Sequence, residues 1–344
     1  MELLHKLKLL TSEYGVSGNE ARVSDIAASM LSEYAGVQTD EFGNVLGKIP
    51  CGDGRAPTLL LDAHIDQIGF MVTEITPEGF LRFIPIGGVD GRMLPGSELT
   101  VLTRRHGNIR GVVGAVPPHL QSRPQTDALD MSDMTVDIGM TGPEARSVVS
   151  VGDYMCFAGD ALPLLNGRVS SKALDDRACF LCILYALELL KGKKLKVDLL
   201  ISASTKEELG GHGAQFVSER ENIDFAVAVD VCHAKTGDAP EIECELSGGA
   251  KVSVGANSRP GFAEKVIEAA KKHGIPCQVS SCPSRSGTNA WSIQPSNGGI
   301  CTLVVSLPLK YMHSPVEVLD VDDVKNCGAL LAAFISDFDG RVDE

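Results

Sequence analysis

Residues 57–66 of the sequence read Pro-Thr-Leu-Leu-Leu-Asp-Ala-His-Ile-Asp, a continuous apolar run that ends in polar side chains. A short run without alternating polar positions is typical of a parallel strand that is buried on both faces. His64 and Asp66 follow the run, where a strand of an open α/β sheet would leave its carboxyl end. This stretch therefore predicts a central sheet covered by helices, with polar side chains gathered at one edge.

The segments around this run alternate between helical and strand patterns. Residues 20–34 place their apolar side chains on one face of a helix. After about residue 170, apolar runs alternate with further helical patterns, the helices at 176–191, 262–273 and 322–336 and the strands at 197–203, 225–230, 275–280 and 300–306. Such alternation indicates an α/β fold with a mostly parallel central sheet and helices on both faces.

The pattern changes between about Ile68 and Gly159. Short apolar runs are separated there by Gly and Pro, with no convincing helix among them, at 68–74, 79–84, 98–103, 109–113, 134–138 and 153–158. Short strands with frequent turn residues are typical of a small all-β barrel or sandwich. We therefore expect one α/β domain, built from residues 1–66 and 163–344, that is interrupted by an inserted barrel-like β domain at 67–162.

Composition restricts the classes of partner. The 344 residues carry a net charge of −14, which argues against nucleic acid because a phosphate-binding surface needs clustered Lys and Arg. No apolar run approaches the ~20 residues that cross a bilayer, and residues 1–10 lack the apolar core of a signal peptide. We expect a cytoplasmic protein without membrane contact. The pair Cys179 and Cys182 is interpreted as reduced core residues rather than a zinc or redox motif.

Residue types that bind cations follow several of the predicted strands and helix starts. They are His64 after strand 57–62, Asp175 at the start of helix 176–191, Glu207 and Glu208 after strand 197–203, Asp230 at the end of strand 225–229, and His313 after the last strand. Each has an ordinary alternative role, such as a first-turn acid of a helix. Together, histidine and carboxylate without cysteine suit a hydrolytic zinc, cobalt or manganese site better than a structural zinc site.

The adjacent pair Glu207 and Glu208 is the most informative of these. Neighbouring side chains on a strand point to opposite faces, but where a strand breaks into a loop both can surround one water molecule. One carboxylate can then bind a cation while the other accepts a proton from that water. Because a bound cation lowers the pKa of water toward ~7, a glutamate suffices as general base. The pair indicates a metal-dependent hydrolase.

The chain resembles the M42 family of metallo-aminopeptidases, which belongs to the co-catalytic zinc exopeptidases. The segments that carry the resemblance keep the family's order over nearly the full length: Ala63-His-Ile-Asp66, Ile86-Gly-Gly-Val-Asp90, Pro117-Pro-His-Leu120, Leu174-Asp-Asp-Arg177, Thr205-Lys-Glu-Glu208, Ala228-Val-Asp230 and Tyr311-Met-His-Ser-Pro315. As a set they are specific, although no single segment would be.

The resemblance implies a role for each candidate residue. Asp175 would bridge two divalent cations, with His64 and Asp230 completing one site and Glu208 and His313 the other; zinc is expected first, with cobalt and manganese as alternatives. Glu207 would be the general base, and Asp66 would orient the His64 imidazole. The implied activity is removal of N-terminal residues from peptides. The inserted β domain would serve self-association, possibly up to a dodecamer.

Departures and alternatives remain open at this point. Gln67, Asn289 and the stretch around His212 differ from the family's usual residues, which leaves the preferred N-terminal residue undetermined. Arg177 and Arg285 could contact an acidic substrate side chain, although surface arginines are commonly only solvated. A deacylase or carboxypeptidase of the same fold group is the alternative activity. A glycoside hydrolase is disfavoured because aromatic residues make up only 5% of the chain.

Overall fold

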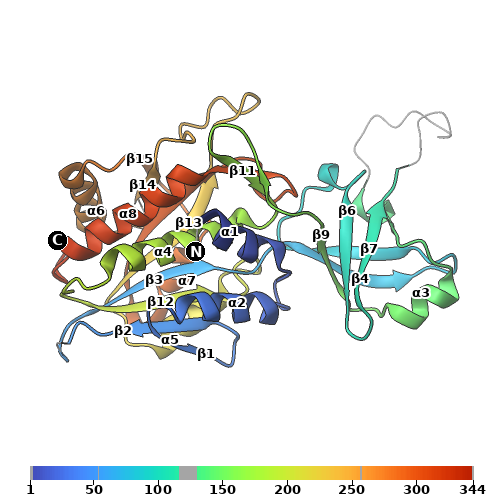
Figure 1. Ribbon diagram of the computed structural model, residues 1–344, viewed down its shortest axis with the longest axis horizontal. Helices are drawn as coiled ribbons and strands as arrows, with labels where there is room; N and C mark the ends of the chain where they lie inside the picture. The colour runs from blue at the N-terminus through green and yellow to red at the C-terminus, as the bar shows by residue number, and fades with distance from the viewer. Residues whose placement is uncertain (1–2, 53, 116–129, 256–257, 343–344) are drawn as a thin grey trace.

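The computed structural model describes residues 3–52, 54–115, 130–255 and 258–342 (Figure 1). The segment 117–120, part of the family resemblance, lies outside these residues. The helices are α1 (Leu3–Ser12), α2 (Ala21–Leu31), α3 (Gly142–Val148), α4 (Leu174–Leu190), α5 (His212–Arg220), α6 (Pro260–His273), α7 (Ala290–Ile293) and α8 (Val321–Asp337). Among the described residues, none of the helices has the apolar length needed to cross a membrane.

An eight-stranded sheet forms the centre of the α/β part, as the run at 57–62 predicts. Its strands, in spatial order, are β1 (Gly36–Thr39), β2 (Val45–Ile49), β12 (Asp198–Ser204), β3 (Thr58–His64), β13 (Phe225–His233), β16 (Cys301–Leu309), β14 (Ala250–Gly255) and β15 (Cys277–Cys282). The central strands β12, β3, β13 and β16 are parallel, whereas β14 runs antiparallel to β16. The predicted fold class, a mostly parallel sheet, is confirmed.

Helices cover both faces of this sheet, and alternate residues of β3 show how. Leu59 and Leu61 enter the larger core, which α1, α2, α4, α6 and α8 cover, and Leu60 enters a smaller core under α5 and α7. Two-sided burial is the reason why strand 57–62 is apolar at consecutive positions. A separate three-stranded sheet joins β10 (Leu162–Pro163), β11 (Arg168–Ser171) and β17 (Glu317–Asp320).

The stretch between Gly69 and Phe157 forms a closed barrel, which lies at one end of the molecule in Figure 1. Its strands are β4 (Gly69–Ile75), β5 (Leu81–Ile86), β8 (Val136–Asp137), β7 (Gly107–Val113), β6 (Glu98–Thr103) and β9 (Tyr154–Phe157). Phe70 packs edge-on against Phe83 and Phe157 in the barrel core. Closure leaves no long exposed strand edge.

The expectation that this stretch contains no helix is wrong, because α3 lies within it. The sequence carried the signal: Thr141 and Glu144 form a reciprocal capping box, and Pro143 occupies the first turn. Seven residues are too few for a clear apolar periodicity, so the hydrophobic pattern does not predict this helix. The helix does not alter the barrel topology.

Candidate active site

The site begins at the carboxyl end of β3. His64 is almost completely buried, and its Nε2 atom lies 3.2 Å from an oxygen of Asp175 at the start of α4. Its Nδ1 atom lies 3.2 Å from the main-chain carbonyl of Asp66 and 3.4 Å from the Asp66 carboxylate. With Nδ1 held on this side, Nε2 is the ring atom left to face the other candidate ligands.

Asp66 also holds the segment that carries the paired glutamates. Its carboxylate accepts hydrogen bonds from the main-chain N–H groups of Glu207 (3.0 Å) and Glu208 (3.2 Å), and from the hydroxyl of Ser17. A fully buried carboxylate with this many donors fixes the backbone where β12 breaks into a loop. Asp66 therefore contacts the His64 ring, as predicted, and in addition holds the backbone of the two glutamates in place.

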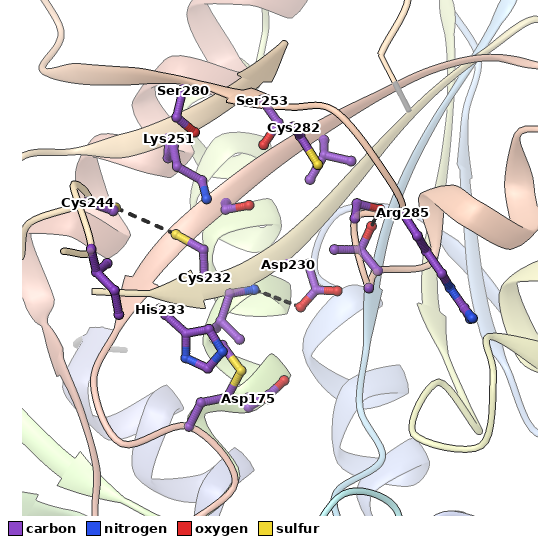
Figure 2. A pocket seen from close by; sticks show the side chains of 18 of the residues that line it. Asp175, Asp230, Cys232, His233, Cys244, Lys251, Ser253, Ser280, Cys282 and Arg285 are labelled. Atoms are coloured by element: carbon purple, nitrogen blue, oxygen red, sulfur yellow. Dashed lines mark hydrogen bonds between the residues drawn. The ribbon is translucent and has the colours of Figure 1, made fainter. Parts of the chain in front are cut away.

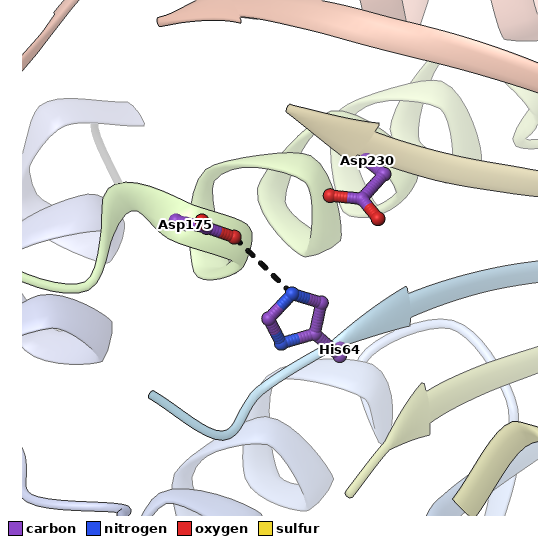
Figure 3. A group of neighbouring side chains, drawn as sticks. All are labelled: His64, Asp175 and Asp230. Atoms are coloured by element: carbon purple, nitrogen blue, oxygen red, sulfur yellow. Dashed lines mark ion pairs between the residues drawn. The ribbon is translucent and has the colours of Figure 1, made fainter. Parts of the chain in front are cut away.

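Asp175 lies between the two histidines; Figure 3 shows its contact with one of them, His64. One of its oxygens faces His64 at 3.2 Å and the other faces His313 at 3.4 Å. Burial alone would raise the pKa of Asp175, but the contacts with His313 and His64 lower it below its usual value. The peptide bond between Asp175 and Asp176 is cis.

The candidate ligands form two groups that share one member. In the first, ligand atoms of His64, Asp175 and Asp230 all lie within 4.8 Å of one another, and in the second the same holds for Asp175, Glu208 and His313. The structure thus brings together all five residues that were predicted as cation ligands. Glu207 belongs to neither group, and its carboxylate lies 3.8 Å from His64 Nε2.

The ring of His313 is oriented from the barrel side. Its Nδ1 atom lies 2.7 Å from the carbonyl oxygen of Gly88, in the segment that follows β5, so this nitrogen is the donor. Nε2 then faces Asp175 and Glu208, each at 3.4 Å. His313 itself has a positive φ of 61°, a conformation that non-glycine residues adopt rarely.

Sequence reasoning missed Glu317, a buried residue at the start of β17. Its carboxylate accepts hydrogen bonds from the main-chain N–H groups of Leu174 (2.7 Å), Asp175 (3.2 Å) and His313 (3.0 Å). One side chain thus ties together two of the three segments that supply the second group, those of Asp175 and His313. The sequence places it two residues after the His313-Ser-Pro315 segment, which hints that it lies near the site. Its burial, however, follows from the pairing of β17 with β11 and cannot be inferred from the local sequence.

Burial also shapes the electrostatics of the site. It raises the pKa of Asp230 well above the usual range, and the negative charges of Glu207 and Asp175 add to the effect. The pKa of Glu208 is raised in the same direction, mainly by burial and by Asp175. Burial likewise raises the pKa of the Glu207 carboxyl to about 7. The site therefore gathers carboxylates whose negative charges are poorly compensated by the protein.

A cavity of about 730 Å³ opens over the two groups (Figure 2). Arg285 lies at its wall, but Arg177 does not line it. Arg177 is fully buried and donates to the carbonyls of Ile65, Leu10 and Glu13, so the expectation that it could contact substrate is wrong. Asn289 is also buried and donates to Asp62, at 2.7 Å.

A doubly covered α/β sheet that gathers histidines and carboxylates into two groups beside a large cavity is an arrangement typical of metal-dependent hydrolases. The family model described as M42 glutamyl aminopeptidase matches residues 43–330. The chain belongs to this family. It is accordingly an aminopeptidase, an exopeptidase that hydrolyses peptides.

Known proteins of the family resemble the chain over almost its whole length. A lysyl aminopeptidase of Pyrococcus furiosus is 34% identical, with 96% of each chain covered. The structure of a TET aminopeptidase from a marine sediment Thaumarchaeota archaeon superposes with a TM-score of 0.92 at 29% identity, covering 98% of this chain and 97% of that one. The TET1 peptidase of Pyrococcus horikoshii, which can assemble into a tetrahedron or a large octahedral shell, gives 0.86 at 30% identity, covering 98% and 100%.

Proposed function

We propose that the chain is a two-cation aminopeptidase in which Asp175 serves both cations. His64 and Asp230 would hold one of them, and Glu208 and His313 the other. The observation that supports this arrangement is the pair of ligand groups with Asp175 in common. Imidazole and carboxylate donors without thiolate suit zinc, with cobalt and manganese as the alternatives to be tested.

The charges of the site fit two divalent cations. Asp175, Glu207, Glu208 and Asp230 together carry four negative charges when ionised, and all four are largely or completely buried. Burying like charges without compensation is costly, and it is the cause of the raised pKa values at Asp230 and Glu208. Two divalent cations would balance these charges.

When bound, such cations act as Lewis acids toward the scissile carbonyl and toward the attacking water. The remaining steps fall to the chain's own residues. Glu207 would accept the proton of the water at its carboxylate and later deliver it to the leaving amine, since this carboxylate lies beside the first ligand group without belonging to it. Asp66 would keep this carboxylate in place through the main-chain N–H groups of Glu207 and Glu208.

The metal-stripped protein, refilled with zinc, cobalt or manganese, should recover activity on aminoacyl-anilides. In the refilled enzyme, Glu207→Gln should lower kcat by roughly 100- to 10,000-fold while metal content stays near that of the wild type. Glu264→Gln on α6 is the matched control, because its side chain is exposed and remote in sequence from every candidate ligand. Full activity after chelation, or in Glu207→Gln, would refute the proposal.

N-acylated amino acids, assayed beside the anilides, separate this activity from that of a deacylase. A free α-amino group at the cleaved residue should be required. Faster turnover of the N-acylated substrates would favour the deacylase.

We further propose that residues 1–66 and 163–344 form the catalytic domain and that the inserted residues 67–162 mediate self-association. The barrel exposes large apolar side chains on its outer surface, among them Ile84 and Val112, each about half exposed. Such side chains, where they gather, mark contact sites between proteins. Light scattering on the chain in solution should give a multimeric mass, and a monomeric mass would contradict this proposal.

A further inference from the structure

Two thiols lie side by side in the wall of the cavity, outside both ligand groups. Cys232 is on β13 and Cys244 is on the segment between β13 and β14, and their Sγ atoms are 3.6 Å apart, the contact that Figure 2 marks with a dashed line. Both residues line the cavity, and each keeps a small exposed surface, 8% for Cys232 and 7% for Cys244. Neither thiol has a part in the proposed hydrolysis.

The cysteine pair that the sequence suggests for thiol chemistry lies elsewhere. Cys179 and Cys182 on α4 also interact with each other, but both are buried in the larger core and neither lines the cavity. Thiols enclosed in a core are chemically inert, because reagents cannot reach them. Cys232 and Cys244 are 12 residues apart in the sequence and form no motif, yet the fold brings them together at a place that small molecules can enter.

The chain between the two thiols folds back on itself. After β13 it leaves the sheet and returns, and the main-chain N–H of Lys235 donates to the carbonyl of Cys244 at 2.7 Å. Most of residues 236–243 are exposed to solvent. A disulfide has a bond length of about 2.05 Å, so the two sulfur atoms would need to approach by only about 1.5 Å. An exposed segment that is already held beside β13 can supply a movement of this size.

Cys244 has the surroundings of a nucleophilic thiol. The hydrogen bond with Cys232 lowers the pKa of the Cys244 thiol against the effect of burial, and the positive charge of Lys251 adds to this lowering. A lowered pKa beside an ammonium group increases the fraction of thiolate, which is the reactive form. Lys251 lines the same cavity, so its charge faces any reagent that enters there.

We infer that Cys232 and Cys244 are a modification site, which a two-electron oxidant of the peroxide class converts into a disulfide in the wall of the substrate cavity. The Cys244 thiolate attacks one peroxide oxygen: an S–O bond forms, the O–O bond breaks, and the leaving hydroxide takes up the proton that Cys244 had lost. The Cys232 sulfur then attacks the sulfenic acid: the S–S bond forms, the S–O bond breaks, and water leaves with the Cys232 proton. The sulfurs lose two electrons, and the peroxide becomes two water molecules.

The disulfide acts on the cavity from two sides. Ile242 and Glu243 precede Cys244 and line the cavity, so this part of the wall moves when Cys244 is drawn toward β13. On the other side, Cys232 lies two residues from the candidate ligand Asp230 on the same strand. Oxidation therefore narrows and stiffens the space that a peptide would enter. This consequence rests on the proposed aminopeptidase function, because peptide hydrolysis is its readout.

Peptide mapping tests the linkage without any turnover. Trypsin cleaves after Arg and Lys, so it releases Cys232 in the peptide 221–235 and Cys244 in the peptide 236–251, with no other cysteine in either. After the zinc-loaded protein is treated with hydrogen peroxide, these two peptides should be found joined, and a phosphine reductant should separate them. Zinc is the cation to use because it has no redox chemistry of its own.

Turnover of an aminoacyl-anilide, measured on the same samples after removal of the peroxide, tests the consequence. Oxidation should lower kcat/KM by roughly 10-fold, since displacements near 1 Å in a site have effects of this size or larger. Zinc content should stay unchanged. The phosphine should restore the activity, which it could not do if oxidation of Met312 in the cavity wall were the cause, because methionine sulfoxide needs its own reductase.

Cysteine variants, each compared with its own untreated sample, assign the effect to the pair. Cys244→Ser and Cys244→Ala should give no joined peptides and keep their activity after peroxide, and Cys232→Ser should likewise give no joined peptides. Cys282→Ser is the matched control, because Cys282 also lines the cavity but its thiol donates to the carbonyl of Ser284, at 3.5 Å. This variant should respond to peroxide as the wild type does.

The outcomes separate the two proposals. If the peptides stay separate after peroxide treatment, with each thiol unmodified or oxidised alone, the modification site is overturned. A joined pair that leaves kcat/KM unchanged overturns its action on the cavity. If the untreated protein hydrolyses no aminoacyl-anilide with any cation, the proposed function itself fails, while peptide mapping still decides whether the two cysteines form a disulfide.

Discussion

Two buried charged regions meet at the start of α4, and they are built in opposite ways. The basic one consists of Lys172 and Arg177, whose donors are taken up by main-chain carbonyls: those of Thr11 and Glu13 for Lys172, and those of Leu10, Glu13 and Ile65 for Arg177. The acidic one consists of Asp175, Glu207, Glu208 and Asp230, whose neighbours include one another. A buried charge with protein partners supports the fold, whereas carboxylates gathered without enough donors provide a place for cations.

The contrast is tested most strongly by Asp230→Asn. The variant keeps the shape of the side chain and its acceptor for the Val231 N–H, but removes one buried negative charge. We expect kcat/KM to fall by roughly 1000-fold, about 4 kcal/mol in activation free energy, together with loss of one cation. The metal-free variant should be at least as stable as the metal-free wild type in urea. A substantial loss of stability would mean that the acidic region supports the fold too.

Arg177→Met should give the opposite result. Removing the guanidinium leaves the buried carbonyls of Leu10 and Ile65 without this donor, whereas that of Glu13 keeps Lys172, so we expect the free energy of unfolding to fall by about 3 kcal/mol. Metal content per folded chain should be retained. Urea unfolding and metal analysis measure the two quantities, and Arg220→Met on exposed α5 is the control, with an expected change below about 0.5 kcal/mol. An unchanged free energy of unfolding in Arg177→Met would contradict the claim that the buried basic region supports the fold.

The pH dependence of stability at Lys172 gives a third test of the comparison between the basic and the acidic region. Burial, with Arg177 nearby, lowers the pKa of Lys172 to about 8 from an ordinary 10.5. Between these values the unfolded chain binds more protons than the folded one, so this group's contribution to stability rises with pH across the window and is lost as pH falls through 8. The free energy of unfolding of the metal-free wild type, minus that of Lys172→Met, should rise by up to about 3 kcal/mol from pH 8 to pH 10.5. A flat difference would show that Lys172 stays protonated.

Local sequence patterns were sufficient to predict most of the fold and most of the candidate ligands. The run at 57–62 is apolar at consecutive positions because both faces of β3 are buried, and strand exits are where α/β proteins place polar side chains. Residues that act through partners distant in the sequence gave no such signal. Glu317 looks like any strand glutamate until its three N–H donors are seen.

The contact between His313 and the Gly88 carbonyl bears on the order of events during synthesis of the chain. The second ligand group needs a histidine near the carboxyl end, and the ring of that histidine is held by a segment next to the barrel. No partial chain that stops before His313 can present this second group, so capture of its cation must follow the folding of the carboxyl-terminal part. Loops this long close late, after local elements have formed. A chelator should therefore yield an inactive protein that keeps its fold, ready to be reloaded through the open cavity.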